Sequence, residues 1–413
     1  MVGRRFPKQT VRDIDVYRKT VLVRTDYNVP LMRNGAISDD LRIRASLPTL
    51  QYLIEQQCKI VVISHLGRPK KREKRLSLSV VAHHLQTLLG RSVQFVDDCV
   101  GDTVRRAVRH ATYGSVIMLE NLRFYPEEET DDPVFAHAVQ RAVQADYFIQ
   151  DGFGVSHRSH ASTHAITLYI PGIAGLLLEK EYVTITQAIH RPRSPFIVLI
   201  GGVKVSDKIA VIKRFIPMAD RILIGGAMAN AFLQYRGYSI GDSVVEPDQG
   251  KIIQDIYAVA EEKVGSDQVD NFLVLPRDVA VAESASTTIP RREVLVNKVA
   301  QGDMVLDIGS KTIDRFTAII AAAKTVVWNG PMGYTETDTF SIGSARVALA
   351  IAQNKGITSI IGGGDTADFI LKWDGHDGQS FSHVSTGGGA SMELMAGKKL
   401  PGIESLLDVH GLR

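Results

Sequence analysis

Basic side chains recur at one kind of position in the first half of the chain, directly after short β-branched runs that predict strands. They are His65, Arg68, Arg123 and Arg158, and His157 and His160 flank the last of them. One arginine after one strand usually forms a surface salt bridge. Because the carboxyl ends of parallel strands meet at one edge of a sheet, several such residues together predict a pocket for a small polyanion.

Further polar residues follow the first predicted strand. Asp26 and Asn28 lie just past it, and Arg42 lies in the first turn of a predicted helix that Asp39 or Asp40 would cap. An arginine at a helix N-terminus opposes the helix dipole, so Arg42 either extends into solvent or binds an anion. We favour the anion.

The second half of the chain repeats a different pattern, in which a predicted strand ends in glycines and a predicted helix follows. The glycines lie at 201–202, 225–226, 362–364 and 387–389. Such loops present free backbone N–H groups and the positive end of a helix dipole, where a phosphate can bind. The three consecutive glycines at 387–389 favour a functional loop, whose N–H groups would meet a transferring phosphoryl group.

Charged side chains accompany these glycine loops. Lys204 and Lys208 are four residues apart, which predicts one helix face where an anion binds, with a solvated lysine pair as the alternative. Asp365 and Thr366 begin another predicted helix. Asp365 is then either an N-cap, which is the commoner role, or a ligand of Mg²⁺ on the phosphates of a nucleotide.

Two loops offer room for the base and the sugar of a nucleotide. Only small residues follow Gly225 and Gly226, which suits a flat ring against the backbone, although we favour tight helix–sheet packing as their explanation. Glu336 follows the loop at 329–331 closely enough to accept hydrogen bonds from ribose hydroxyls. Neither GxxxxGK[S/T] nor a GxGxxG after a strand occurs, so the fingerprints of Walker-type nucleotidases and standard dinucleotide folds are absent from the sequence.

The predicted elements alternate along the chain. Short continuous apolar runs, such as those at 20–24 and 196–200, predict strands buried on both faces of a parallel sheet. Segments of helical period lie between them, and this alternation predicts an α/β, doubly wound fold. A Pro/Gly loop and a predicted helix at 170–195 form the predicted hinge between two domains.

Composition argues against several classes of protein. A net charge of +3 from 48 basic and 45 acidic residues is too balanced for a nucleic-acid-binding or membrane-surface protein. Cys58 and Cys99 lie far apart without a CxxC motif, which supports neither a disulfide framework nor a zinc site. No signal peptide and no apolar run of roughly 18 residues is visible, so we expect a soluble, cytoplasmic protein. The charged runs at 70–75 and 127–132 are predicted to be solvated loops.

A series of motifs resembles the phosphoglycerate kinase family. They are RTDYNVP, RIRASLP, SHLGRP, LENLRF, DGFGVSHRSHAS, GGVKVSDKI, LIGGAMA, WNGPMG, GGGDT and STGGGAS, and they run in this order from Val21 to about Gly402. Three sites depart from the commoner pattern of the family. Gly152 stands where alanine is usual, Ser310 where proline is usual, and Tyr334-Thr335 where Val-Phe is usual.

The resemblance implies a reaction and a site for each substrate. The reaction is reversible, Mg²⁺-dependent phosphoryl transfer from 1,3-bisphosphoglycerate to ADP, made in line after domain closure. His65, Arg68, Arg123 and Arg158 would hold the remote phosphate of 3-phosphoglycerate, while Asp26, Asn28 and Arg42 would orient its other end. The nucleotide would be held by Gly201, Gly202, Lys204, Lys208, Gly225, Gly226, Asn329, Pro331, Glu336, Gly364, Asp365 and Thr366, with Asp365 toward Mg²⁺. Catalysis would fall to Arg42, Lys204, Gly387, Gly388 and Gly389.

The resemblance also implies a domain plan of two Rossmann-like domains with parallel sheets, joined by a hinge helix. The plan comprises a phosphoglycerate-binding domain at 1–178, a hinge helix at 179–192, a nucleotide-binding domain at 193–390 and a C-terminal segment at 391–413 that returns to the first domain. Family habit predicts a monomer that acts on small molecules, with no nucleic-acid or membrane partner.

Two other functions remain open at this point. A different acyl-phosphate or carboxylate kinase would have no use for a pocket that binds a remote phosphate. A catalytically silent nucleotide-binding protein is the second alternative, and the complete set of expected reactive residues argues against it.

Overall fold

The computed structural model describes residues 6–286 and 290–409, and within them the chain divides into two compact units. Unit 1 contains residues up to Val183 together with those from Lys399 onward, and unit 2 contains Thr184–Lys398. The ends of the first and last segments of the predicted domain plan, residues 1–5 and 410–413, lie outside the described residues.

Unit 1 is built around a sheet of six parallel strands in the order β3-β4-β2-β1-β5-β6. The strands are β1 (Thr20–Arg24), β2 (Lys59–Ile63), β3 (Val93–Val96), β4 (Val116–Leu119), β5 (Tyr147–Gln150) and β6 (Gly172–Ala174). All of β4, and all of β1 and β2 except the first residue, is buried. These are the strands covered on both faces that continuous apolar runs predict.

Helices cover this sheet in pairs. They are α1 (Leu41–Glu55), α2 (Ser79–Leu89), α3 (Gly101–His110) and α4 (Pro133–Val143). Helix α1 packs against α2, and α3 packs against α4. The start of α4 is encoded locally, because the Asp132 carboxylate accepts a hydrogen bond from the Phe135 N–H at 2.8 Å and Pro133 occupies the first turn.

Unit 2 contains a second sheet of six parallel strands, in the order β15-β14-β13-β7-β8-β9. The strands are β7 (Phe196–Ile200), β8 (Arg221–Ile224), β9 (Leu273–Val274), β13 (Thr325–Asn329), β14 (Thr358–Gly362) and β15 (His383–Val384). Its helices are α6 (Ile209–Phe215), α7 (Met228–Tyr235), α8 (Gly250–Val264), α9 (Val269–Phe272), α10 (Ser310–Ala321), α11 (Ile342–Gln353), α12 (Gly364–Asp374) and α13 (Gly389–Met395). The predicted fold class, two α/β domains with parallel sheets, is confirmed.

A third sheet was not predicted. It consists of the antiparallel strands β11 (Arg292–Leu295), β10 (Asp278–Ala282) and β12 (Met304–Ile308), and it belongs to unit 2. No α-helix lies between these strands, whereas an α-helix lies between most consecutive strands of the parallel sheets. The alternation of strand and helix that guided the sequence analysis therefore could not reveal them.

Helix α5 (Leu176–His190) carries the chain from unit 1 into unit 2, and the boundary between the units falls inside it. Its first turn is tied to unit 1 by Asp151, whose Oδ1 accepts hydrogen bonds from the Thr49 hydroxyl at 2.7 Å and the Leu177 N–H at 3.0 Å. Burial raises the pKa of Asp151 to about 7.

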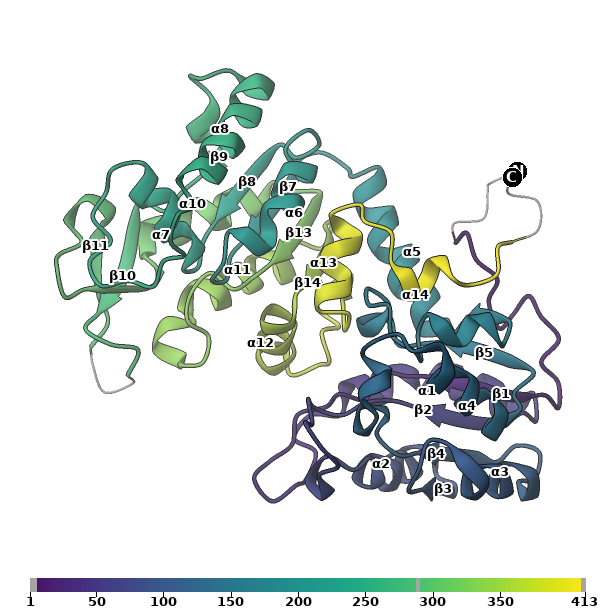
Figure 1. Cartoon of the computed structure of the whole chain (residues 1–413). Coiled ribbons are helices and arrows are strands. Elements are labelled where there is room, and N and C mark those ends of the chain that lie inside the picture. The colour runs from purple at the N-terminus through teal and green to yellow at the C-terminus, as the bar shows by residue number, and fades with distance from the viewer. Residues whose placement is uncertain (1–5, 287–289, 410–413) are drawn as a thin grey trace. The chain divides into compact units, whose positions relative to one another are not determined.

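The end of the chain packs on unit 1, where Figure 1 shows the yellow C-terminal segment with α14 (Pro401–Glu404). The Gly402 N–H donates to the Ser156 carbonyl and the Leu407 N–H to the Gly172 carbonyl, both at 2.9 Å. This return begins at Lys399 and not at residue 391, because residues up to Met395 form helix α13 of unit 2. Among the described residues, no helix is long and apolar enough to cross a membrane.

Candidate active site

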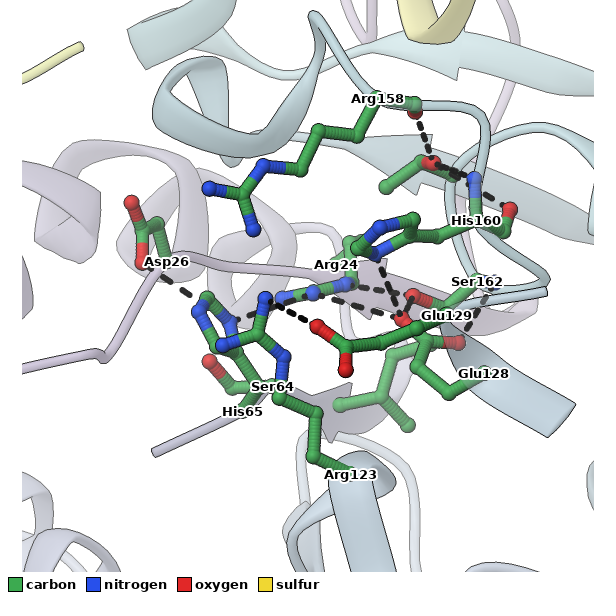
Figure 2. A network of polar contacts seen from close by, with 12 residues as sticks. Arg24, Asp26, Ser64, His65, Arg123, Glu128, Glu129, Arg158, His160 and Ser162 are labelled. Atoms are coloured by element: carbon green, nitrogen blue, oxygen red, sulfur yellow. Dashed lines mark hydrogen bonds and ion pairs between the residues drawn. The ribbon is translucent and has the colours of Figure 1, made fainter. Parts of the chain in front are cut away.

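In unit 1 three of the predicted basic residues and Asp26 lie at the carboxyl ends of four neighbouring strands. Arg123 follows β4, His65 follows β2, Asp26 follows β1 and Arg158 follows β5, and these strands are consecutive in the sheet. Figure 2 shows the guanidinium groups of Arg123 and Arg158 directed toward a common region beside Asp26 and His65. The sheet therefore brings together side chains that lie far apart in the sequence.

Two side chains hold the loops of this edge in place. The Asn121 amide donates to the Leu66 carbonyl at 2.8 Å, and its oxygen accepts from the Arg123 N–H at 3.1 Å. The Ser64 hydroxyl donates to the Thr25 carbonyl and accepts from the Tyr27 N–H, both at 2.8 Å. The segments that carry the basic residues are thus cross-linked through short polar side chains.

Asp26 and Arg42 form an ion pair at this edge. The Arg42 Nη1 lies 2.7 Å from the Asp26 Oδ2. Burial alone would raise the pKa of Asp26, but the guanidinium groups of Arg42 and Arg24 and the hydrogen bond from the Asn28 N–H favour its charged form, and its pKa is lowered to about 2. Arg42 therefore does not extend freely into solvent. It is already paired with Asp26, which orients its guanidinium group.

The sequence analysis missed the most deeply buried charges of the site. Arg24, the last residue of β1, is fully buried, and Glu128 is fully buried beside it at 3.7 Å. Arg24 also donates to the Ser162 hydroxyl at 2.7 Å, and that hydroxyl donates to Glu128 at 2.6 Å. The prediction that residues 127–132 form a solvated loop is wrong at Glu128, because the buried guanidinium requires a buried carboxylate.

One signal in the sequence pointed to Arg24. It is the only charged residue of the run TVLVR, and its neighbours in β1 are apolar side chains. A charge inside a strand that is covered on both faces needs a partner nearby. Nothing in the run EEETDD distinguishes Glu128 from its neighbours, so only the folded chain identifies that partner.

Both buried histidines of this edge are held neutral. Burial lowers the pKa of His65 well below its usual range, and Arg24, Arg123 and Arg42 add to the effect. Burial and the same kind of cationic surroundings lower the pKa of His160 to about 3. Two neutral imidazoles in a cluster of guanidinium groups can donate hydrogen bonds to an anion without adding to the repulsion.

The other predicted residues of this site differ in how strongly they are held. Arg123 donates to the Gly67 carbonyl at 2.7 Å and pairs with Glu129 at 2.9 Å. The Asn28 side chain accepts from the Gly67 N–H at 2.8 Å. Arg68 is exposed and makes no ion pair with any described residue, so its charge is available to a ligand.

In unit 2 the glycine loops lie at the carboxyl ends of β7, β8, β13, β14 and β15. Close packing explains several of these glycines. A Cβ atom on Gly201 would lie 2.1 Å from the Pro331 carbonyl oxygen, and one on Gly226 would lie 2.4 Å from the Gly202 nitrogen. The packing explanation that we favoured for Gly225 and Gly226 is consistent with this geometry.

The predicted lysine pair does not share a helix face. Both lysines precede α6, and Lys208 ends the short 3-10 helix Ser206–Lys208. The Lys208 Nζ is buried and donates to the carbonyls of Gly201 at 2.7 Å and Asn329 at 3.1 Å, and burial lowers its pKa to about 8. Lys208 therefore connects the carboxyl ends of β7 and β13 through hydrogen bonds to their backbone, whereas Lys204 is exposed.

Asn329, the last residue of β13, is buried with both polar atoms of its side chain unpaired among the described residues. The neighbouring Thr366 accepts a hydrogen bond from the Gly330 N–H at 2.7 Å. Asp365 is exposed in the first turn of α12 and is not its N-cap, which is Gly363. Both polar atoms of the Asn329 amide can therefore still form hydrogen bonds with a ligand or with water.

The last glycine loop has part of the geometry that the sequence predicts. The Gly387 N–H is taken by the Ser385 hydroxyl at 3.1 Å, while the N–H groups of Gly388 and Gly389 bond to no other described residue. Gly388 has φ of 51° immediately before α13. Pro331 is buried and Glu336 is exposed, and both follow β13. The exposed Gly364 is the first residue of α12, which follows β14.

In each unit the predicted site residues thus lie mainly at the carboxyl end of the parallel sheet, and their surroundings are cationic in unit 1 and rich in glycine in unit 2. This fold and these sites define an α/β phosphotransferase class of protein. A sequence model described as phosphoglycerate kinase matches residues 11–398. Phosphoglycerate kinase of Moorella thermoacetica is 45% identical over 402 residues, covering 97% of this chain and 99% of the relative.

Solved structures give the same result. Phosphoglycerate kinase from Coxiella burnetii is 34% identical with a TM-score of 0.82, and the match covers 97% of this chain and 98% of that one. The enzyme from Pyrococcus horikoshii is 31% identical with a TM-score of 0.83, covering 96% and 98%. The chain belongs to the phosphoglycerate kinase family, which confirms the resemblance that its motifs showed.

Proposed function

We propose that this chain catalyses the reversible transfer of a phosphoryl group from 1,3-bisphosphoglycerate to ADP, giving 3-phosphoglycerate and ATP. The observation that carries the proposal is the cluster of guanidinium groups at the sheet edge of unit 1. Burial lowers the pKa of Arg24 and of Arg123, and the positive charge of the nearby Arg158 lowers both further. The exposed Arg68 adds an unpaired charge. Such a cluster suits a ligand with a fixed phosphate.

Each end of phosphoglycerate has candidate partners in unit 1. His65, Arg68, Arg123 and Arg158 would bind the remote phosphate, since these groups supply several donors and little negative charge. Asp26 stays ionised because of its low pKa and can accept a hydrogen bond from the hydroxyl of the substrate. Arg42, oriented by Asp26, and Asn28 would contact the reacting carboxyl end.

The nucleotide would bind at the strand ends of unit 2. The unpaired Asn329 amide supports this assignment, because a phosphate or ribose group could satisfy it. The exposed Asp365 carboxylate fits a Mg²⁺ ion that arrives on the nucleotide. No three His, Cys, Asp or Glu side chains among the described residues form a metal site by themselves, so phosphate oxygens and water would complete the coordination. When bound, the ion would neutralise charge on the transferred phosphate.

Catalysis would be electrostatic. The carboxylate of 3-phosphoglycerate has a pKa of about 3 to 4 and is ionised at neutral pH, so no general base is required. Charge on the equatorial oxygens of the moving phosphoryl group would be stabilised by Arg42, Lys204 and the N–H groups of the loop at 387–389. Two of those N–H groups, on Gly388 and Gly389, have no partner among the described residues.

The two ligands bind to different units, so transfer requires a conformational step that aligns them. We propose that this step is a movement at α5 that also excludes water from the acyl phosphate. Small-angle scattering should then detect compaction when both ligands are present together. A scattering profile unchanged by the ligand pair would contradict this step without contradicting the reaction.

The decisive experiment is an assay of Mg²⁺-dependent ATP formation from ADP and 1,3-bisphosphoglycerate. Arg68→Gln should raise KM for the phosphoglycerate substrate by at least about tenfold, since a charge-assisted hydrogen bond contributes about 1.5–3 kcal/mol. The matched control is Arg91→Gln, an exposed arginine before β3 at the opposite end of the strands, which should leave KM unchanged. Equal rates with acetyl phosphate would instead favour a different acyl-phosphate kinase, and no ATP at all would favour a silent nucleotide-binding protein.

The assignment of Lys204 can be tested with the same assay. Lys204→Ala should lower kcat by about 10² to 10³ with a small change in KM, as expected for a group that stabilises the transition state. A change confined to KM would limit the lysine to ground-state binding.

Two further proposals rest on the family alone. We propose that the enzyme acts in the cytoplasm and as a monomer. Size-exclusion chromatography with light scattering tests the second point, and a mass of twice 45.3 kDa would contradict it.

A further inference from the structure

Unit 2 also contains a pocket whose lining residues lie outside the glycine loops. It has a volume of about 410 Å³ and is formed by the end of α7, the segments around β9 and β11, and α10. Its apolar wall includes Tyr238, Leu275 and Leu295, and the Tyr238 and Leu295 side chains are 38% and 42% exposed. A partly apolar cavity of this size can hold a small organic molecule.

Three arginines also line this pocket. Arg236 is fixed, because both of its terminal nitrogens bind the Asp270 carboxylate at 2.8 Å. Arg277 and Arg315 line the same pocket and form no ion pair with any described residue. Since Asp270 is occupied by Arg236, the pocket keeps an excess of positive charge.

The unpaired guanidinium groups lie close enough to affect one another. Partial burial lowers the pKa of Arg315, and the neighbouring Arg277 and Arg221 lower it further. The Asp270 carboxylate only partly offsets these effects at Arg315. A bound anion that contacts Arg277 and Arg315 would therefore reduce the remaining repulsion between them. Guanidinium groups can also bind such an anion through paired hydrogen bonds.

This pocket is separate from the proposed nucleotide site. None of its lining residues belongs to the glycine loops, and it meets α7 at the C-terminal end, whereas Gly225 and Gly226 precede the N-terminus. The eight residues of α7 separate the two places by about 12 Å at a rise of 1.5 Å per residue. A ligand here would not occupy the place of the nucleotide.

We propose that this pocket, between the apolar side chains of Tyr238, Leu275 and Leu295 and the guanidinium groups of Arg277 and Arg315, binds a small organic anion. The ligand carries a phosphate or carboxylate head group on an apolar body. The head group binds the two unpaired arginines, and the apolar body covers the exposed ring and leucine side chains. The proposal does not depend on the proposed reaction, since no residue of that machinery takes part.

The test uses methyl NMR of the full chain with labelled leucine, because the methyl groups of Leu275 and Leu295 report on this pocket alone. Phenyl phosphate is the first probe, and inorganic phosphate and benzoate separate the contributions of the head group and the ring. Phenyl phosphate should shift both methyl signals in a saturable way. Its dissociation constant should be lower than that of inorganic phosphate. The comparison with benzoate shows which head group the pocket prefers.

Variants then assign the binding to the arginines. A double variant, Arg277→Gln and Arg315→Gln, should weaken phenyl phosphate binding at least tenfold, as measured from the shifts of these methyl signals. The control is Arg346→Gln in α11, outside the pocket, which should leave the binding unchanged. Tyr238→Ala should weaken phenyl phosphate more than inorganic phosphate, and it serves as the second variant if the double variant does not fold.

Three results would overturn the proposal. They are wild-type signals of Leu275 and Leu295 that do not respond to any probe, shifts that do not saturate, and binding that survives both the double substitution and Tyr238→Ala. Shifts confined to methyl groups near the glycine loops would likewise mean that the probes bind only at the site already described.

Discussion

Glu128 allows a direct test of how the cationic site of unit 1 is held together. Its carboxylate is fully buried, accepts hydrogen bonds from the hydroxyl and the N–H of Ser162 at 2.6 and 3.0 Å, and balances the buried Arg24. Glu128→Gln keeps the size of the side chain but removes its charge. The Arg24 guanidinium then stays buried without a carboxylate, which typically costs about 3–5 kcal/mol of stability.

Glu129 provides the matched control. It also pairs with an arginine, Arg123 at 2.9 Å, but its side chain is 52% exposed. Because water screens an exposed pair, Glu129→Gln should cost about 0–1 kcal/mol. The two adjacent substitutions therefore make the same chemical change and differ mainly in burial.

Hydrogen exchange with mass spectrometry measures the difference within the intact chain. The most protected amides of β1 and β5 should exchange about 10² to 4 × 10³ times faster in Glu128→Gln, since each 1.4 kcal/mol corresponds to a factor of ten. Peptides from β13 and β14 in unit 2 serve as an internal reference and should not change. If Glu128→Gln and Glu129→Gln accelerate exchange equally, the buried pair does not stabilise unit 1 in the way its geometry indicates.

Three other predictions concern single residues. The pKa of Asp151 in the folded protein, about 7, lies above its usual 3.8, so its contribution to stability is complete below pH 3.8 and is lost as the pH rises through 7. Asp151→Asn should therefore make the free energy of unfolding in urea depend less on pH. An unchanged pH dependence would count against this prediction. Gly330→Ala should lower the melting temperature, because φ is 93° and the new Cβ would lie 2.2 Å from the Gly201 carbonyl oxygen; a stability change below about 0.5 kcal/mol would contradict this. Asn329→Leu should weaken ADP binding by at least about tenfold in calorimetry without lowering stability, because its buried amide has no described partner; unchanged affinity would exclude a contact with the nucleotide.

The strands show how far the sequence could predict the fold. Runs such as 116–119 and 196–200 are apolar throughout and are buried throughout, so their covering on both faces followed from composition. Strand β3 was missed because it is short and lies at the edge of its sheet, where Gln94 is exposed and Phe95 is only partly buried. The antiparallel sheet of β10–β12 was missed because no α-helix separates its strands.

The site shows a similar division. Residue type and position after a strand identified His65, Arg123 and Arg158, since parallel strands deliver their ends to one edge. Whether a charge at that edge is free or paired did not follow from local sequence. Arg42 is paired with Asp26, and Lys208 bonds to two backbone carbonyls, because other loops bring their acceptors within reach.

The sequence by itself determined most strands of the two parallel sheets, the division into two α/β domains and the family, because these depend on local periodicity and on motifs that can be recognised without coordinates. Only the tertiary structure decided which charges neutralise one another. Glu128 reads as one more acidic residue in a polar run, yet it is buried against Arg24, which lies more than a hundred positions earlier. Burial and distance set the strength of an ionic contact, and both are properties of the folded chain.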